Sequence, residues 1–170
     1  TQRFALPDRM VDPETMVIPV SGTREALFMI ALAAVPETKN GQKPVVLMPN
    51  PFYQVYLGAA VMAGAEPVFV PADSDNGFLP DFAGLPEEIL ARTALAYYCS
   101  PANPQGAIAS MDTMKQLVTL ARAYDFLLVS DECYSELYYG EPPTGGAEAC
   151  AALGDDGPGA MRNVAVMNSL

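Results

Sequence analysis

The sequence predicts an α/β protein in which helices cover both faces of a mostly parallel β-sheet, a three-layer α/β/α arrangement. Short apolar runs alternate with segments of helical periodicity along the 170 residues. Most of these runs are apolar at every position, which is typical of strands buried on both faces of a parallel sheet. The length suits one domain with a full hydrophobic core, and 51% of the residues are apolar.

Six apolar runs, bounded by turn-forming or polar residues, are predicted to be strands. In chain order they cover residues 16–20, 44–48, 67–70, 93–99, 126–129 and 164–167. The helical segments between them are expected to pack on the two faces of the sheet.

Five segments are predicted to be helices. The first follows Ser21, Gly22 and Thr23, carries apolar side chains at helical spacing and ends at Pro36. Ser110 is expected to cap the helix that runs to Tyr124, because its hydroxyl can accept from a free backbone N–H. The other helices are expected at 56–63, 85–91 and 147–153.

Composition excludes several classes of function. The 9 Lys and Arg against 20 Asp and Glu give a net charge of −11, which argues against nucleic acids and anionic membranes as partners. The longest apolar stretch, 26–35, is too short to span a bilayer. The chain has no His, so His-based catalysis and His-based metal sites are excluded. Any chemistry must therefore use carboxylates, Tyr, Lys, backbone amides or a cofactor.

The three cysteines, Cys99, Cys133 and Cys150, show no CxxC spacing. They predict reduced thiols and a cytoplasmic location rather than a disulfide framework. Each is expected to be a small packed side chain rather than a nucleophile.

Four polar segments fall where strands or strand-like runs are predicted to end, and ligands collect at such ends in open α/β sheets. They are SGTRE (21–25), NPFYQVY (50–56), SPANPQG (100–106) and SDECYSE (130–136). The first either binds an anion at a helix start or is an ordinary N-cap. The aromatics of the second either stack on a planar ligand or seal the core. Asn103 in the third either donates to a ligand or initiates a turn.

Asp131 in the fourth segment leaves its strand at the predicted ligand edge. A buried carboxylate there needs a partner such as a protonated ring nitrogen or an Arg, and Tyr134 could share that site. Glu132 and Glu136 are expected to face solvent. A Mg²⁺ site would need further converging carboxylates, and the other strand ends supply none, so no metal is predicted.

Five stretches in this order resemble the large domain of the fold type I, pyridoxal-phosphate-dependent aminotransferases of class I/II. They are SGTREALF, PNPFYQVYLGAA, GAEPVF, CSPANPQGA and SDECYSELY, and the resemblance covers nearly the whole chain. It is closest to the bacterial succinyldiaminopimelate aminotransferases of lysine biosynthesis. The resemblance implies pyridoxal 5′-phosphate (PLP) as cofactor, a homodimer, and amino-acid and keto-acid substrates. The implied pair is succinyldiaminopimelate with glutamate and 2-oxoglutarate.

The resemblance assigns one group of residues to the cofactor phosphate. Gly22, Thr23 and Arg24 match the turn whose backbone and hydroxyl bind it, and Ser169 matches a phosphate-binding Ser.

A second group matches the residues around the cofactor ring. Tyr53 matches the aromatic that stacks on the pyridine, and Asp131 matches the carboxylate that keeps the pyridine nitrogen protonated. Asn103 and Tyr134 match the residues that hydrogen-bond the ring oxygen. Gln105 stands where the family usually has Thr, and its side chain is not the key contact.

The Schiff-base lysine of the family has no match in this chain. Lys39, Lys43 and Lys115 do not follow strands at the ligand edge, and in the family pattern Ser-x-x-Lys the lysine would come two residues after Leu170. No catalytic residue is therefore assigned. Residues 1–170 are interpreted as part of the PLP-binding large domain, without the N-terminal arm, the lysine region and the small domain. We expect the 170-residue chain alone to lack transaminase activity.

Two other functions fit the same residues. The chain could belong to a non-catalytic, aminotransferase-like scaffold or regulator, which the missing lysine favours. It could also belong to a PLP-dependent lyase or decarboxylase of the same fold.

Overall fold

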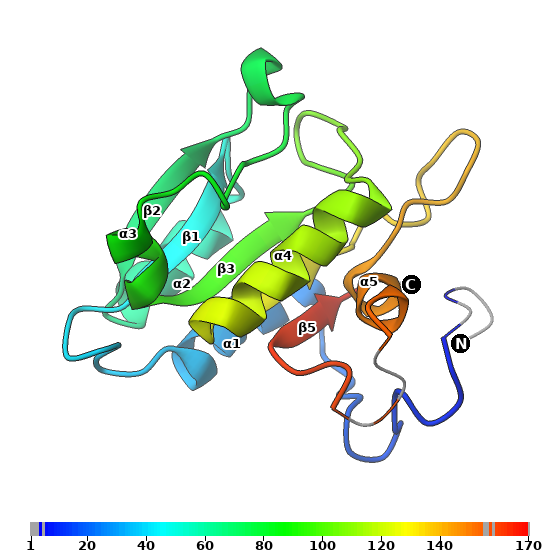
Figure 1. Ribbon diagram of the computed structural model, residues 1–170, viewed down its shortest axis with the longest axis horizontal. Helices are drawn as coiled ribbons and strands as arrows, with labels where there is room; N and C mark the ends of the chain where they lie inside the picture. The colour runs from blue at the N-terminus through cyan, green and yellow to red at the C-terminus, as the bar shows by residue number, and fades with distance from the viewer. Residues whose placement is uncertain (1–3, 5, 155–156, 158, 170) are drawn as a thin grey trace.

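The computed structural model describes residues 4, 6–154, 157 and 159–169. One five-stranded sheet runs through it, with the strands in the spatial order β2-β1-β3-β4-β5 (Figure 1). The strands are β1 (Val45–Asn50), β2 (Glu66–Pro71), β3 (Thr93–Cys99), β4 (Leu127–Asp131) and β5 (Val164–Met167). All four pairings within this sheet are parallel, which confirms the predicted fold class.

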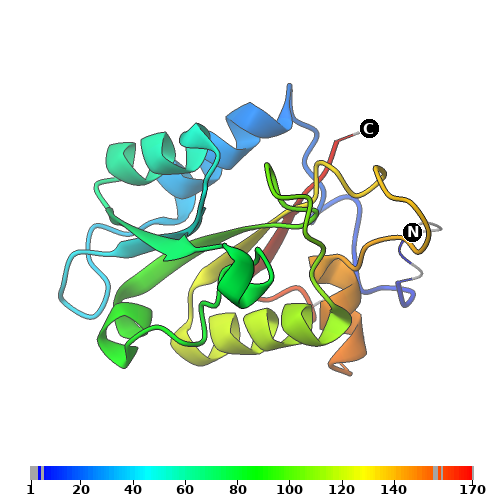
Figure 2. The ribbon, with the colours of Figure 1, turned by 90° about the horizontal axis from the view of Figure 1, so that it is seen from above.

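Helices form a layer on each side of the sheet (Figure 2). One layer contains α1 (Thr23–Ala34) and α2 (Gln54–Met62), and the other contains α3 (Glu87–Arg92), α4 (Met111–Tyr124) and α5 (Gly146–Ala152). A short 3₁₀ turn, η1 (Ser74–Asn76), follows β2. No helix in the described part of the chain is long and apolar enough to cross a membrane.

The core has two halves because successive residues of a strand point to opposite faces of the sheet. Leu95 and Tyr97 of β3 pack with α1 and α2, whereas Ala96 and Tyr98 pack with α4. All seven residues of β3 are buried. This two-sided burial explains why the strand sequences are apolar at every position.

The topology creates a place for a ligand between β1 and β3. From β1 the chain crosses to β2 at one edge, and it then returns to β3 on the other side of β1. The loops that leave β1 and β3 therefore diverge at the carboxyl edge of the sheet, which is the usual position of a binding crevice in open α/β sheets.

The strand predicted at 16–20 is wrong. This segment forms no strand, and the side chains of Val17, Ile18 and Val20 are each at least 50% exposed. An apolar run becomes a strand only if it pairs with a neighbouring strand, and in the described residues this segment pairs with neither edge strand, β2 or β5. The other predicted strands and helices have bounds within three residues of the observed ones.

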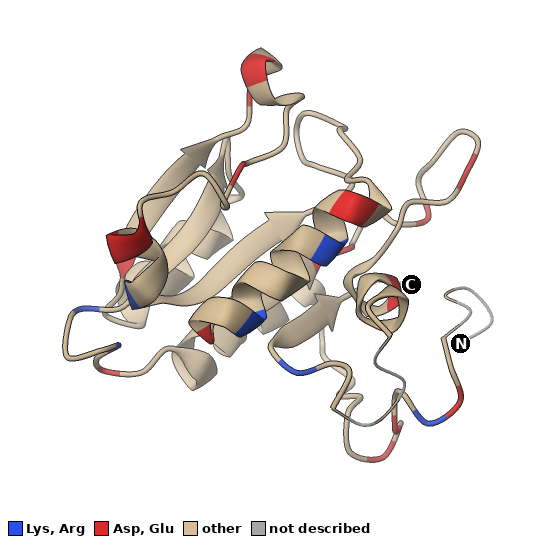
Figure 3. Cartoon of the chain, viewed as in Figure 1, with Lys and Arg blue, Asp and Glu red and all other residues tan. Residues whose placement is uncertain are grey.

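Acidic residues lie mainly in loops and at helix starts (Figure 3). Glu87 and Glu88 lie in the first turn of α3, and Asp112 lies in the first turn of α4. Negative charge at these positions interacts favourably with the helix dipole. Ser110 caps α4 as predicted, since its Oγ accepts a hydrogen bond from the backbone N–H of Thr113 at 3.1 Å.

We expect the Ser110→Ala variant to lower the free energy of unfolding by about 1 kcal/mol, because α4 loses its N-cap acceptor. Urea denaturation followed by circular dichroism measures this loss. Ser74→Ala, at an exposed serine of η1, is the control and should change stability little. Equal stability of S110A and S74A would contradict the capping role.

Candidate active site

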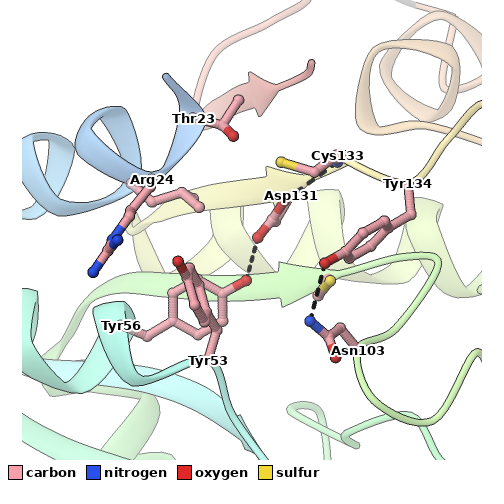
Figure 4. A pocket seen from close by; sticks show the side chains of 10 residues that line it. Thr23, Arg24, Tyr53, Tyr56, Asn103, Asp131, Cys133 and Tyr134 are labelled. Carbon is pink, nitrogen blue, oxygen red and sulfur yellow. Dashed lines mark hydrogen bonds between the residues drawn. The ribbon is translucent and has the colours of Figure 1, made fainter. Parts of the chain in front are cut away.

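A pocket of about 180 Å³ opens at the carboxyl edge of β1, β3 and β4 (Figure 4). Its lining comes from the start of α1, the loop and helix after β1, the end of β3 with its loop, and the end of β4 with its loop. The lining residues are Thr23, Arg24, Leu27, Tyr53, Tyr56, Cys99, Asn103, Asp131, Cys133 and Tyr134. Six of the eight predicted cofactor-binding residues thus meet at one site.

Asp131 is the last residue of β4 and is only 5% exposed. The hydroxyl of Tyr56 donates a hydrogen bond to Oδ2 of Asp131, and the backbone N–H of Cys133 donates to Oδ1 at 3.3 Å. No Lys or Arg in the described residues forms an ion pair with this carboxylate. A buried carboxylate with neutral donors only is suited to receive a cationic group of a ligand.

Tyr56, which donates to Asp131, is part of a rigid aromatic stack. Its side chain is 1% exposed, and its ring stacks on that of Tyr97 with centroids 4.3 Å apart and planes 9° apart. The Tyr97 hydroxyl donates to the carbonyl of Leu27 in α1 at 2.6 Å. Burial, with a smaller effect of the Asp131 charge, raises the pKa of Tyr56 far above its usual value. Its hydroxyl therefore stays protonated and remains a donor to Asp131.

Sequence reasoning missed Tyr56, although one signal was present. Tyr56 comes three residues after Tyr53, and α2 begins at Gln54, so both rings lie near one side of its first turn. They meet edge to face with centroids 5.9 Å apart. Leu27 and Cys99 were also missed. Leu27 reaches the pocket through the packing of α1, and Cys99 reaches it through the strand register that pairs it with Asp131.

The start of α1 forms one wall of the pocket. Gly22 precedes the helix, and no side chain caps it, so the first backbone N–H groups have no intrahelical partner. Thr23 lies beside Asp131 and Cys133 in the site, whereas the exposed side chain of Arg24 extends away from Asp131 (Figure 4). Free N–H groups at a helix start attract anions.

Asn103 and Tyr134 come from different loops and meet at the pocket. Nδ2 of Asn103 donates to the Tyr134 hydroxyl at 3.0 Å. The family resemblance implies that both residues bind one ligand oxygen, and the structure brings their polar atoms within hydrogen-bond distance of each other.

Two predicted residues do not line the pocket. Gly22 lies next to Thr23 at the start of α1, and Ser169 is exposed after β5, where its N–H donates to Oδ1 of Asn168 at 2.7 Å. The predicted lysine would follow Leu170, which lies outside the described residues. Their roles stay predictions.

The expectation that Glu132 faces solvent is wrong, whereas Glu136 is exposed as expected. Glu132 is only 2% exposed, and its Oε1 accepts from the Ser130 hydroxyl at 2.8 Å and from the backbone N–H of Gly146 at 2.7 Å. Because side chains alternate along extended chain, Asp131 points toward α1 and α2 while Glu132 points toward α5.

The pocket thiols are poor nucleophiles at neutral pH. Burial raises the pKa of both Cys99 and Cys133 to about 12, and for Cys99 the nearby Asp131 charge adds to the effect. The third thiol, of Cys150, is buried in the core. In the described residues no cluster of three or more His, Cys, Asp or Glu is arranged to hold a metal ion.

Comparison with known proteins identifies the family. Residues 3–170 match the model of the family described as aminotransferase class I and II. The chain belongs to this family. It is 35% identical to the LL-diaminopimelate aminotransferase of Aquifex aeolicus over 136 residues, which cover 79% of this chain and 34% of the relative. The chain spans about a third of the length of the curated relatives that it matches.

Solved aminotransferase structures share the fold. An aminotransferase from Neisseria meningitidis is 38% identical with a TM-score of 0.84, covering 94% of this chain and 39% of that one. A Thermus thermophilus protein described as a probable N-succinyldiaminopimelate aminotransferase is 26% identical with a TM-score of 0.76. Here too the match covers 94% of this chain and 39% of the other.

We expect Tyr56→Phe to lower the free energy of unfolding of this aminotransferase chain by about 1–3 kcal/mol, since the buried Asp131 carboxylate loses a donor. Urea denaturation measures the change. Tyr139→Phe removes the same hydroxyl from a fully exposed ring and should leave stability unchanged. If the two variants lose equal stability, the hydrogen bond to Asp131 contributes nothing.

The reaction of Cys133 with iodoacetamide should accelerate about tenfold per pH unit from pH 7 to pH 10, because only the thiolate reacts and its pKa lies above this range. An unperturbed thiol, with a pKa of about 8.5, would approach a plateau within the same range. Mass spectrometry of the labelled peptide gives the rate, and Cys133→Ser identifies the site. A plateau anywhere between pH 7 and pH 10 would contradict the raised pKa.

Proposed function

We propose that the protein transfers an amino group between an amino acid and a 2-keto acid, with PLP as cofactor. The observation that carries this proposal is the buried Asp131 carboxylate, held by neutral donors at a pocket that an aromatic ring and a helix start also line. We propose that residues 1–170 belong to the PLP-binding large domain of a cytoplasmic homodimer.

The residues present fit PLP on chemical grounds. Asp131 offers a negative charge to a protonated pyridine nitrogen, and no Lys or Arg in the described chain neutralises that charge. Tyr53 provides an aromatic face, and Asn103 and Tyr134 provide polar groups for the ring oxygen. The free N–H groups at the start of α1 suit the phosphate.

The side chains of this chain would each have a separate task. When bound, PLP supplies an electron sink for the bond broken at the substrate α-carbon. Asp131 would keep the ring nitrogen protonated, and the hydrogen bond from Tyr56 would hold the Asp131 carboxylate in a fixed orientation. Tyr53 would fix the plane of the ring, and Thr23 would anchor the phosphate end. The lysine that the family uses for proton transfer is expected beyond Leu170.

For the substrate we propose N-succinyldiaminopimelate, with glutamate and 2-oxoglutarate as the other pair, in lysine biosynthesis. The resemblance of SGTREALF and SDECYSELY supports this choice, and so does the similar Thermus thermophilus structure. The curated relatives are named for LL-diaminopimelate, which shares the same carbon skeleton but lacks the succinyl group. The unacylated compound is therefore the natural competitor.

The full-length protein should form glutamate when incubated with N-succinyl-LL-diaminopimelate, 2-oxoglutarate and PLP. Coupled glutamate detection, run in parallel with LL-diaminopimelate, separates the two substrates. Faster turnover of the unacylated compound would overturn the proposed substrate. Release of carbon dioxide or free ammonia without glutamate would identify a decarboxylase or lyase, and no product from a panel of amino donors would favour a non-catalytic protein.

We expect Asp131→Asn in the full-length protein to bind PLP about 10- to 100-fold more weakly, because a charge-assisted hydrogen bond becomes a neutral one. Titration of PLP against protein fluorescence measures the dissociation constant. Asp112→Asn, at an exposed carboxylate of α4, is the matched control and should bind PLP normally. Wild-type affinity in D131N would contradict the assigned role of Asp131.

A further inference from the structure

We propose that Glu132 is a positioning residue of the cofactor site. Its buried carboxylate joins the end of β4 to the start of α5 and thereby holds the strand end that carries Asp131 and the loop that carries Cys133 and Tyr134. This inference rests on the proposed function, because the site that Glu132 positions is the proposed PLP site. Glu132 itself does not line the pocket, so it would act through its neighbours.

The side chain of Glu132 is fixed from two elements. The Ser130 hydroxyl of β4 and the Gly146 N–H of α5 both donate to Oε1, at 2.8 and 2.7 Å. Removing this acceptor would leave the buried Gly146 N–H without it, and an unsatisfied buried donor is costly. The carboxylate therefore restricts the movement of β4 relative to α5.

Gly145 leaves the space that this carboxylate occupies, and Gly146 allows α5 to pack closely against β4 and β5. A Cβ at Gly145 would lie 2.5 Å from Oε2 and 2.9 Å from Oε1 of Glu132. At Gly146 a Cβ would lie 3.1 Å from the Cβ of Ser130 and 3.2 Å from Cγ1 of Val164. Gly145 has an ordinary extended conformation with φ of −102°, so space rather than backbone strain explains the absence of a side chain.

The backbone of Glu132 fixes the same loop at a further point. Its N–H donates to the carbonyl of Met167 at 2.8 Å, and its carbonyl accepts from the N–H of Ser135 at 3.0 Å. Asn168 Nδ2 donates to the Ser135 hydroxyl at 3.3 Å. Tyr134, whose hydroxyl meets Asn103, lies inside this fixed turn. Glu132 therefore lies where the strand end that carries Asp131 meets the turn that carries Tyr134, so a shift of its backbone would reach both residues.

The test uses the full-length protein and compares Glu132→Ala with Glu132→Gln, which retains an oxygen acceptor. Glu136→Ala removes an exposed carboxylate from the same loop and is the matched control. PLP affinity is measured by fluorescence titration at a temperature where circular dichroism shows every variant folded. We expect E132A to bind PLP about tenfold or more weakly, E132Q to recover most of the affinity, and E136A to match the wild type.

A second measurement does not depend on PLP. Amide hydrogen exchange of residues 131–135 in the PLP-free protein should be faster in E132A than in the wild type, with exchange in β1 and β3 unchanged. If the wild type fails to bind PLP, the proposed function fails, and this exchange result still decides whether Glu132 holds the loop. Unchanged exchange in a folded E132A would overturn the positioning role, and so would equal PLP affinity in E132A and the wild type when the wild type binds PLP.

Gly145→Ala provides the final check. Its added methyl group should displace the Glu132 carboxylate and accelerate amide exchange of residues 131–135. In an E132A background the methyl group has space, so G145A should change the exchange rate little. An equal effect of G145A in both backgrounds would contradict the proposed contact.

Discussion

The burial of two consecutive carboxylates at the end of β4 is the constraint around which this end of the molecule is organised. A buried carboxylate is costly unless hydrogen bonds stabilise it. The alternation of side chains along extended chain sends Asp131 to one face of the sheet and Glu132 to the other, so that each meets different donors. Tyr56 and the Cys133 N–H donate hydrogen bonds to Asp131, and the Ser130 hydroxyl and the Gly146 N–H donate to Glu132.

Each face of the sheet thus contributes differently to the site. On the α1 and α2 face, the stacked rings of Tyr56 and Tyr97 link Asp131 to the carbonyl of Leu27 in α1. Asp131, which would meet the ring nitrogen, and the start of α1, which would meet the phosphate, are therefore connected through the same packed side chains. On the other face, α5 does not line the pocket, but its Gly146 N–H donates to Glu132 and so contacts the loop after β4. Such support is what a binding site needs to hold its contacts in a fixed geometry.

The sequence predicted the sheet and the polar segments at its ligand edge because both depend on local patterns, and the resemblance to a known family selected the site residues within those segments. The runs at 93–99 and 164–167 became β3 and β5 with the same bounds, and the parallel arrangement brought Asn103, Asp131 and Tyr134 to one edge. The misses share a cause, which is that they depend on long-range partners. Tyr56 reaches a residue 75 positions away, and Glu132 is buried by a helix that starts 14 positions later. Hydrophobic periodicity does not reveal either contact.

The fit between the Glu132 carboxylate and Gly145 has an evolutionary consequence. The Glu132 carboxylate and a side chain at position 145 would occupy the same volume, so a larger residue at 145 requires a smaller one at 132. Among proteins that share this domain, those with a long acidic side chain after the strand-ending aspartate should have glycine at the start of the following helix. Those with a short or apolar residue there should be free to have alanine or larger residues. The two positions should therefore co-vary as a pair, and their joint replacement should be tolerated where either single replacement is not.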